Sequence, residues 1–262
     1  MENNNKRKEY LITILHVAFY FFAVYVLSTL IFSIVKFPMK YVFSIDTEYI
    51  KYVAEKRLTF EQTTKEFQIY YLTSSATANL VMYLIIFIVL FCTGFKVIKE
   101  DFITLREKSA KVAFWIPVGL IVTYVIYFTV AICLTPYLTD QSENQQSINQ
   151  ILSSSPTNAL MMIICATIIG PFVEEFIFRH ALFKIIKVDF FAIIISSILF
   201  GLLHTIDSGY ETQQLILQTL PYCAFGFGIA ATYSCSKHNL WVTTIIHMFI
   251  NTVSMFLTLL IF

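Results

Sequence analysis

Residues 158–183 read NALMMIICATIIGPFVEEFIFRHALF, and this stretch decides how the rest of the chain is interpreted. Its apolar character predicts a membrane-spanning helix, because about 20 mostly apolar residues are enough to cross a bilayer. Two glutamates and an arginine interrupt it, at Glu174, Glu175 and Arg179. Ionisable side chains inside a membrane are costly and usually functional. The stretch therefore predicts both a transmembrane fold and a site within it.

The composition of the whole chain also indicates a membrane protein. Hydrophobic residues make up 57% of the 262 residues and charged residues 13%, with a mean hydropathy of +0.71. Soluble proteins carry about 25% charged residues, so an ordinary cytosolic globule is excluded. The net charge of +1 leaves no basic surface for nucleic acid, and we expect no nucleic-acid partner.

Six further apolar stretches accompany the first one, so the expected fold class is an all-α, polytopic transmembrane helix bundle with about seven spans. The expected spans are 10–35, 79–98, 113–134, 158–183, 190–206, 213–234 and 239–261. Basic residues gather before the first span and in alternate short loops, which places the N-terminus in the cytoplasm and the C-terminus outside. The segment 36–78 then lies outside, as an interfacial helix or as a short soluble helix packed on the bundle.

Helical geometry assigns different partners to the two glutamates. Glu175 and Arg179 are four residues apart and face the same way, so they are expected to form an ion pair. Glu174 lies about 100° round the helix from Glu175 and keeps no counter-ion of its own. A desolvated carboxylate of this kind suits a general base. Pro171 removes a backbone hydrogen bond one turn earlier, which predicts a kink that opens polar backbone toward the site.

Two other spans bring hydrogen-bonding side chains to a similar depth. His204 lies in one span, and His247 and Asn251 lie four residues apart on one face of another. At 1.5 Å per residue, these groups and Glu174 fall in one layer of the bilayer about 10 Å thick. A single intramembrane histidine is more often a packing residue than a catalyst, but this convergence predicts an aqueous pocket within the membrane.

These motifs resemble those of the CPBP family of intramembrane peptidases, which includes the type II CAAX endopeptidases and bacteriocin-processing enzymes. The family pattern is Glu-Glu-x-x-x-Arg, Phe-x-x-x-His and His-x-x-x-Asn. It stands here as Glu174 to Arg179, Phe200 to His204, and His247 to Asn251. The resemblance covers about 113–262, which we expect to be a CPBP-like catalytic helix bundle. Residues 1–112 hold the N-terminal spans with the outer segment 36–78.

The resemblance implies a role for each motif residue. Glu174, helped by His204, would activate a water molecule, and His247 and Asn251 would donate to the developing oxyanion. Glu175, Arg179 and Phe200 would orient these groups. The family is commonly called a metalloprotease, and Glu174, His204 and His247 could bind zinc with water as the fourth ligand. The same groups explain a metal-free mechanism, which we favour, so no cofactor is required and zinc is the alternative.

The expected function is an intramembrane endopeptidase that cuts a membrane-associated peptide or protein, with CAAX-type, pheromone or bacteriocin-like substrates as candidates. One alternative is a non-catalytic membrane scaffold, including a bacteriocin self-immunity protein. Another is an ion-coupled carrier that uses the buried carboxylates as a relay. Heavy use of Phe, Ile, Tyr, Lys and Asn is typical of an AT-rich genome, so we expect an integral protein of a bacterial plasma membrane.

Overall fold

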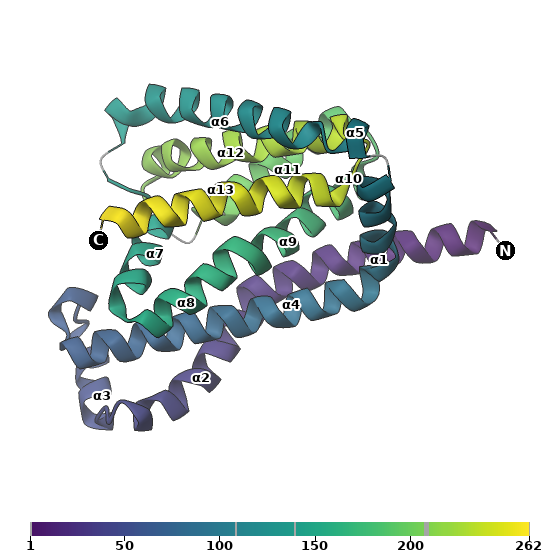
Figure 1. Ribbon diagram of the computed structural model, residues 1–262. Coiled ribbons are helices and arrows are strands. Elements are labelled where there is room, and N and C mark those ends of the chain that lie inside the picture. The colour runs from purple at the N-terminus through teal and green to yellow at the C-terminus, as the bar shows by residue number, and fades with distance from the viewer. Residues whose placement is uncertain (1, 108, 139, 207–209, 262) are drawn as a thin grey trace.

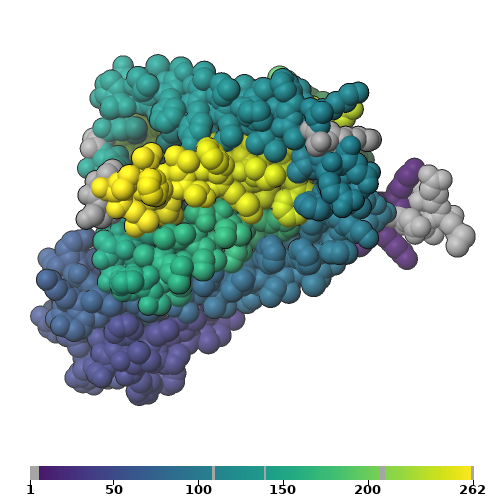
Figure 2. All heavy atoms as spheres, in the orientation of Figure 1, coloured from purple at the N-terminus to yellow at the C-terminus, as the bar shows by residue number. Residues whose placement is uncertain are grey.

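The computed structural model describes residues 2–107, 109–138, 140–206 and 210–261. These residues form helices and no strand, so the predicted all-α helix bundle is confirmed (Figure 1). Six helical segments in the described part are long and apolar enough to cross a membrane. Figure 2 shows the packing order on one face, where α13 lies between α6 and the α8–α9 segment, with α4 and α2 beyond.

The N-terminal part is built from two long helical segments. The first joins α1 (Glu2–Phe22), the π-helical η1 (Ala23–Leu27) and α2 (Ser28–Val42), and the second is the 43-residue α4 (Lys65–Glu107). Between them lie α3 (Thr47–Lys56) and the short η2 (Phe60–Gln62). The predicted outer segment 36–78 therefore contains the end of α2 and the start of α4 as well as α3, and its place outside the membrane stays a prediction. Both long helices continue into it, because a helix can extend past the apolar stretch that marks it in a sequence.

The polar stretch before the motif helix also folds. After α5 (Ser109–Val112) and α6 (Trp115–Leu134), a 3₁₀ turn η3 (Thr135–Tyr137) leads to α7 (Glu143–Ser154). The spans predicted at 113–134 and 158–183 leave residues 135–157 as a connecting loop. Ser142 caps α7, because its side chain accepts a hydrogen bond from the backbone N–H of Gln145. Such a cap satisfies one of the free donors at a helix start.

The motif helix contains two π-helical turns. It runs through α8 (Pro156–Ile164), η4 (Cys165–Ile169), α9 (Gly170–Glu175), η5 (Phe176–Ala181) and α10 (Leu182–Ile186). Turns of this type are rare and often occur at functional sites. Here they flank α9, the short piece that carries Glu174 and Glu175, and every residue of α9 is buried.

Three further helices complete the bundle: α11 (Asp189–Leu203), α12 (Thr212–Cys235) and α13 (Leu240–Ile261). The 15 residues of α11 extend for about 22 Å at 1.5 Å each, less than the roughly 30 Å of hydrocarbon. The predicted span 190–206 thus ends earlier, and His204 is the C-terminal cap of α11. A total of seven spans and a cytoplasmic N-terminus stay predictions.

Close helix contacts hold α12 against its neighbours. A Cβ atom at Gly228 would lie 2.6 Å from Cα of Thr123 on α6, and one at Gly226 would lie 3.2 Å from Cα of Ser197 on α11. Glycine lets helix backbones approach in this way, which is the usual means of packing helices where lipid weakens the hydrophobic effect. The contacts fix α11 and α12, which carry one side of the site.

Candidate active site

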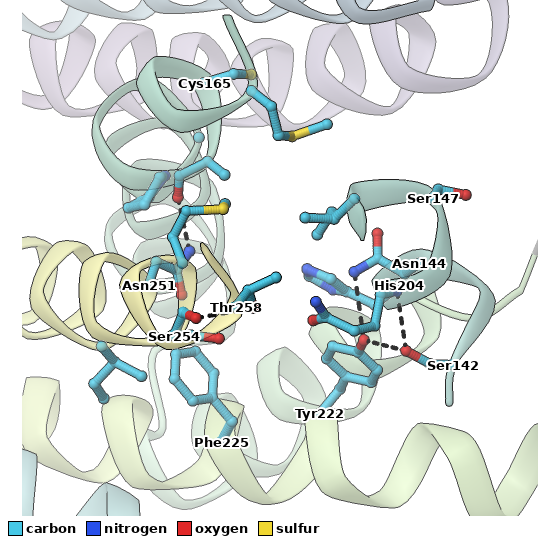
Figure 3. Close-up of a pocket in the computed structure, with 18 of the residues that line it drawn as sticks. Ser142, Asn144, Ser147, Cys165, His204, Tyr222, Phe225, Asn251, Ser254 and Thr258 are labelled. Carbon is cyan, nitrogen blue, oxygen red and sulfur yellow. Dashed lines mark hydrogen bonds between the residues drawn. The ribbon is translucent and has the colours of Figure 1, made fainter. Parts of the chain in front are cut away.

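A cavity of about 1640 Å³ lies between α7 and α13, with walls from α2, α4, α6, α8, α9, α11 and α12. All four predicted catalytic residues line it: Glu174, His204, His247 and Asn251. In Figure 3, His204 and Tyr222 lie on one side of the opening, near α7, and Asn251 and Ser254 lie on the other. The structure therefore brings the motif residues of three separate helices to one hollow.

The predicted ion pair on the motif helix is present and deeply buried. Nε of Arg179 lies 3.3 Å from Oε2 of Glu175, and neither side chain is exposed. The other oxygen of Glu175, Oε1, lies 2.9 Å from Nδ1 of His247. An ionised carboxylate can only accept, so Nδ1 of His247 carries the proton. Glu175 thus neutralises Arg179 and sets the orientation of the His247 ring.

Glu174 has two close partners, whereas the sequence predicted that it would have no counter-ion. The Tyr83 hydroxyl donates to its Oε1 at 3.1 Å, and Oε2 lies 3.7 Å from Nε2 of His247. Because Nδ1 of His247 already donates to Glu175, a second proton on the ring would sit on Nε2 and face Glu174. Nε2 of His247 is therefore the ring nitrogen that faces Glu174, and both side chains line the cavity.

His204 is held in one orientation by its own helix and by α12. Its Nδ1 lies 2.8 Å from the carbonyl oxygen of Phe200, which can only accept, so Nδ1 donates and Nε2 of the neutral ring is an acceptor. The ring stacks on Tyr222 at 4.8 Å between centroids. The Tyr222 hydroxyl in turn bonds Ser142 and Asn144, at 2.8 and 3.3 Å. Tyr222 therefore links α7 to His204.

Phe200 is the aromatic centre of the site. Only 1% of it is exposed, and the Arg179 guanidinium lies 5.3 Å from its ring centroid. The rings of His204 and His247 lie 4.5 and 5.8 Å away. Phe200 thus packs against all three charged or polar groups and fixes their spacing.

Asn251 donates a hydrogen bond to a backbone carbonyl that has no donor because of Pro171. The N–H of Gly170 donates to the Cys165 carbonyl five residues earlier, and the next bond of this series would join position 171 to Ala166. Proline has no N–H, and Nδ2 of Asn251 donates to the Ala166 carbonyl instead, at 2.8 Å. Pro171 thus leaves a carbonyl free, and the π-helical turn before it determines that this carbonyl belongs to Ala166. One N–H of Asn251 remains for the cavity.

The zinc alternative has no assembled ligand set. In the described part of the chain, no three His, Cys, Asp or Glu side chains are grouped so as to hold a metal ion. Glu174, His204 and His247 therefore do not form such a group here. Both the zinc alternative and the metal-free mechanism therefore stay predictions.

Sequence reasoning missed the residues that support the motif residues from other helices. Tyr83 is one of 15 tyrosines and belongs to no recognisable pattern. Tyr222 and Asn144 were missed for a related reason, because α7 was taken for a loop. Only the three-dimensional arrangement identifies these contacts.

Residues 156–253 match the family model described as "Type II CAAX prenyl endopeptidase Rce1-like". The match begins at the first residue of α8 and ends within α13, so it includes all three motifs. The chain contains an Rce1-like domain. Together with the six apolar helices, the Rce1-like domain identifies an integral membrane protein.

Two curated proteins are similar to the chain. The Bacillus subtilis (strain 168) protein named "Putative membrane peptidase YdiL" is 36% identical over 115 residues, 43% of this chain and 41% of that protein. An "Uncharacterized protein" of Mycoplasma capricolum is 36% identical over 98 residues, 37% of this chain and 27% of that protein. The chain thus matches less than half the length of each relative. No solved structure matches it significantly.

Proposed function

We propose that this chain is an intramembrane endopeptidase that hydrolyses a peptide bond in a membrane-associated peptide or protein. One observation supports the proposal above the others. Glu174 lines a large cavity together with His204, His247 and Asn251. The adjacent Glu175 forms an ion pair with Arg179. A reactive carboxylate and a structural carboxylate therefore stand side by side, and only the first can reach a substrate.

The proposed mechanism uses side chains of this chain alone. Glu174, helped by the Nε2 acceptor of His204, removes a proton from a water molecule as the water oxygen bonds to the peptide carbonyl carbon. His247, when its ring carries a second proton on Nε2, and the remaining N–H of Asn251 stabilise the oxyanion that forms. When the C–N bond breaks, Glu174 returns the proton to the leaving amine. Water is consumed, and a carboxylate and an amine are formed.

The wall of the cavity supports a peptide as the substrate. Neutral polar side chains from α7 and α12 and aromatic rings from α4 and α6 line it, including Gln145, Gln218, Tyr71 and Tyr124. Phe128 and Phe249, each 50% exposed, lie at its rim. Hydroxyl and amide groups can form hydrogen bonds with the backbone of an unwound peptide. Apolar side chains at the rim would let such a peptide enter the cavity from the lipid. CAAX-type tails, peptide pheromones and bacteriocin-like precursors in a bacterial plasma membrane are the candidate substrates.

A comparison of cleaved peptides tests the proposal. Membrane and secreted peptides are collected from cells that carry the wild-type chain, Glu174→Gln, or the control Glu100→Gln, which changes an exposed glutamate of α4. We expect at least one peptide that is cut in wild-type and Glu100→Gln cells but intact in Glu174→Gln cells, at equal protein levels. Identical peptides in all three strains contradict the proposal. A Glu174→Gln chain that restores a deletion phenotype favours the scaffold or self-immunity alternative instead.

A further inference from the structure

Tyr83 reaches the site from α4, which lies outside the segment that matches the Rce1-like family. Resting on the proposed function, we propose that Tyr83 is a positioning residue that holds the Glu174 carboxylate for reaction. The reactive site is then shared between the Rce1-like domain and the N-terminal helices, and is incomplete without α4.

The contact is specific to one oxygen of Glu174. The Tyr83 hydroxyl donates to Oε1 at 3.1 Å, whereas His247 faces Oε2. Each carboxylate oxygen can accept more than one hydrogen bond, so both keep a free position for water. The Tyr83 hydrogen bond holds Oε1, and the His247 ring lies beside Oε2, so the rotation of the carboxylate is restricted. A hydrogen bond to an ionised group is also stronger than a hydrogen bond to a neutral group.

The packing of α4 places this hydroxyl without relying on a flexible side chain. Met82, which precedes Tyr83 on α4, and Ile86, about one turn later, are 5% and 0% exposed. One turn earlier, the amide of Asn79 donates to Sγ of Cys165 at 3.7 Å, which joins α4 to η4. The Tyr83 ring faces Gly170, where a Cβ atom would lie 3.8 Å from Cε1 of the ring. The contacts of α4 with the motif helix therefore determine where the Tyr83 hydroxyl lies.

Tyr83→Phe removes the hydroxyl and keeps the ring, and Tyr70→Phe is a matched control. Tyr70 is also on α4 and is 1% exposed, and its hydroxyl donates to the Lys36 carbonyl at 3.3 Å, away from the cavity. Both variants lose one hydrogen bond from the same helix. Only Tyr83→Phe loses a bond to Glu174.

The assay uses the purified full-length chain in liposomes and a quenched-fluorescence peptide. The peptide copies a cut site found in the comparison of wild-type and Glu174→Gln cells. We expect Tyr83→Phe to lower kcat by about 10- to 100-fold, the range for losing a hydrogen bond to a charged group, with KM within about twofold. Tyr70→Phe is expected to leave both constants within about twofold of wild type.

A second comparison separates positioning from a merely structural role. Glu174→Asp withdraws the carboxylate by one methylene group, beyond the reach of Tyr83. In that background Tyr83→Phe is expected to lower kcat by less than about threefold, because the contact is already lost. An equal loss in both backgrounds overturns the inference, as does a Tyr83→Phe variant with wild-type kcat. A wild-type chain that cuts no peptide overturns the proposed function as well.

Discussion

His247 of α13 donates from Nδ1 to Oε1 of Glu175 on α9 across 2.9 Å. The opposite oxygen of Glu175 faces Arg179, and the opposite nitrogen of His247 faces Glu174. The four side chains therefore form a buried row that leads from a structural ion pair to the reactive carboxylate. Changes at one end of the row are expected to affect both stability and reactivity at the other.

Glu175→Gln is expected to destabilise the chain strongly, because it leaves Arg179 as a buried charge without a partner. Breaking one side of a buried pair costs about 3–5 kcal/mol, whereas replacing both partners with apolar residues is close to neutral. The double variant Glu175→Met with Arg179→Met should therefore unfold nearer to the wild-type temperature in detergent. A single variant that is as stable as the double variant would refute this view of the pair.

Asn251→Ala is expected to leave the Ala166 carbonyl without a donor, at a cost of about 1–3 kcal/mol. Pro171→Ala restores a backbone N–H at the position where the π-helical series would supply that bond. In the Pro171→Ala background, Asn251→Ala should then cost about 1 kcal/mol less than it costs alone. Thermal unfolding of the two single variants and the double variant measures the difference. Strict additivity would show that Asn251 does not replace the missing donor.

Tyr222→Phe keeps the ring that stacks on His204 and removes the hydroxyl that bonds Ser142 and Asn144. Since a hydrogen bond contributes about 1 kcal/mol, we expect amide exchange in α7 to rise by about fivefold or more. Hydrogen exchange with mass spectrometry measures the change over residues 143–154. The control Tyr49→Phe loses a bond to the Thr64 backbone and should leave α7 unchanged. Unaltered exchange in Tyr222→Phe would mean that α7 is held without Tyr222.

Gly228→Ala is expected to force α6 and α12 apart, since the new Cβ atom would lie 2.6 Å from Cα of Thr123. A backbone atom cannot move aside as a side-chain end can, so the cost should be about 1–3 kcal/mol. The neighbouring control Phe227→Leu changes a residue that is 42% exposed and should cost less than about 1 kcal/mol. Equal melting temperatures for Gly228→Ala and wild type would contradict the close contact.

The parts of the site that follow from helical periodicity could be predicted from the sequence. The ion pair of Glu175 with Arg179 depends only on a spacing of four residues along one helix. The convergence of Glu174, His204, His247 and Asn251 depends on depth within the span, which apolar stretches reveal. Both features come from local geometry.

Contacts that depend on how helices pack could not be predicted. Tyr83 meets Glu174 because α4 lies against α9, and nothing in the residues around Tyr83 encodes that neighbour. The helix α7 was missed because it is mostly polar and has no apolar stretch that would mark it in the sequence. The early end of α11 was missed because residues 204–206 are still partly apolar. Their sequence gives no clear sign of the turn that they form.

Hydrolysis in isotopically labelled water tests the central claim most directly. Purified wild-type chain and Glu174→Gln are placed in liposomes with a cleavable peptide and water enriched in oxygen-18. The wild-type chain should release a product whose new carboxylate carries one labelled oxygen, and Glu174→Gln should lower kcat by at least about 1000-fold while it remains folded. Labelled product from Glu174→Gln at the wild-type rate would show that Glu174 is not the base.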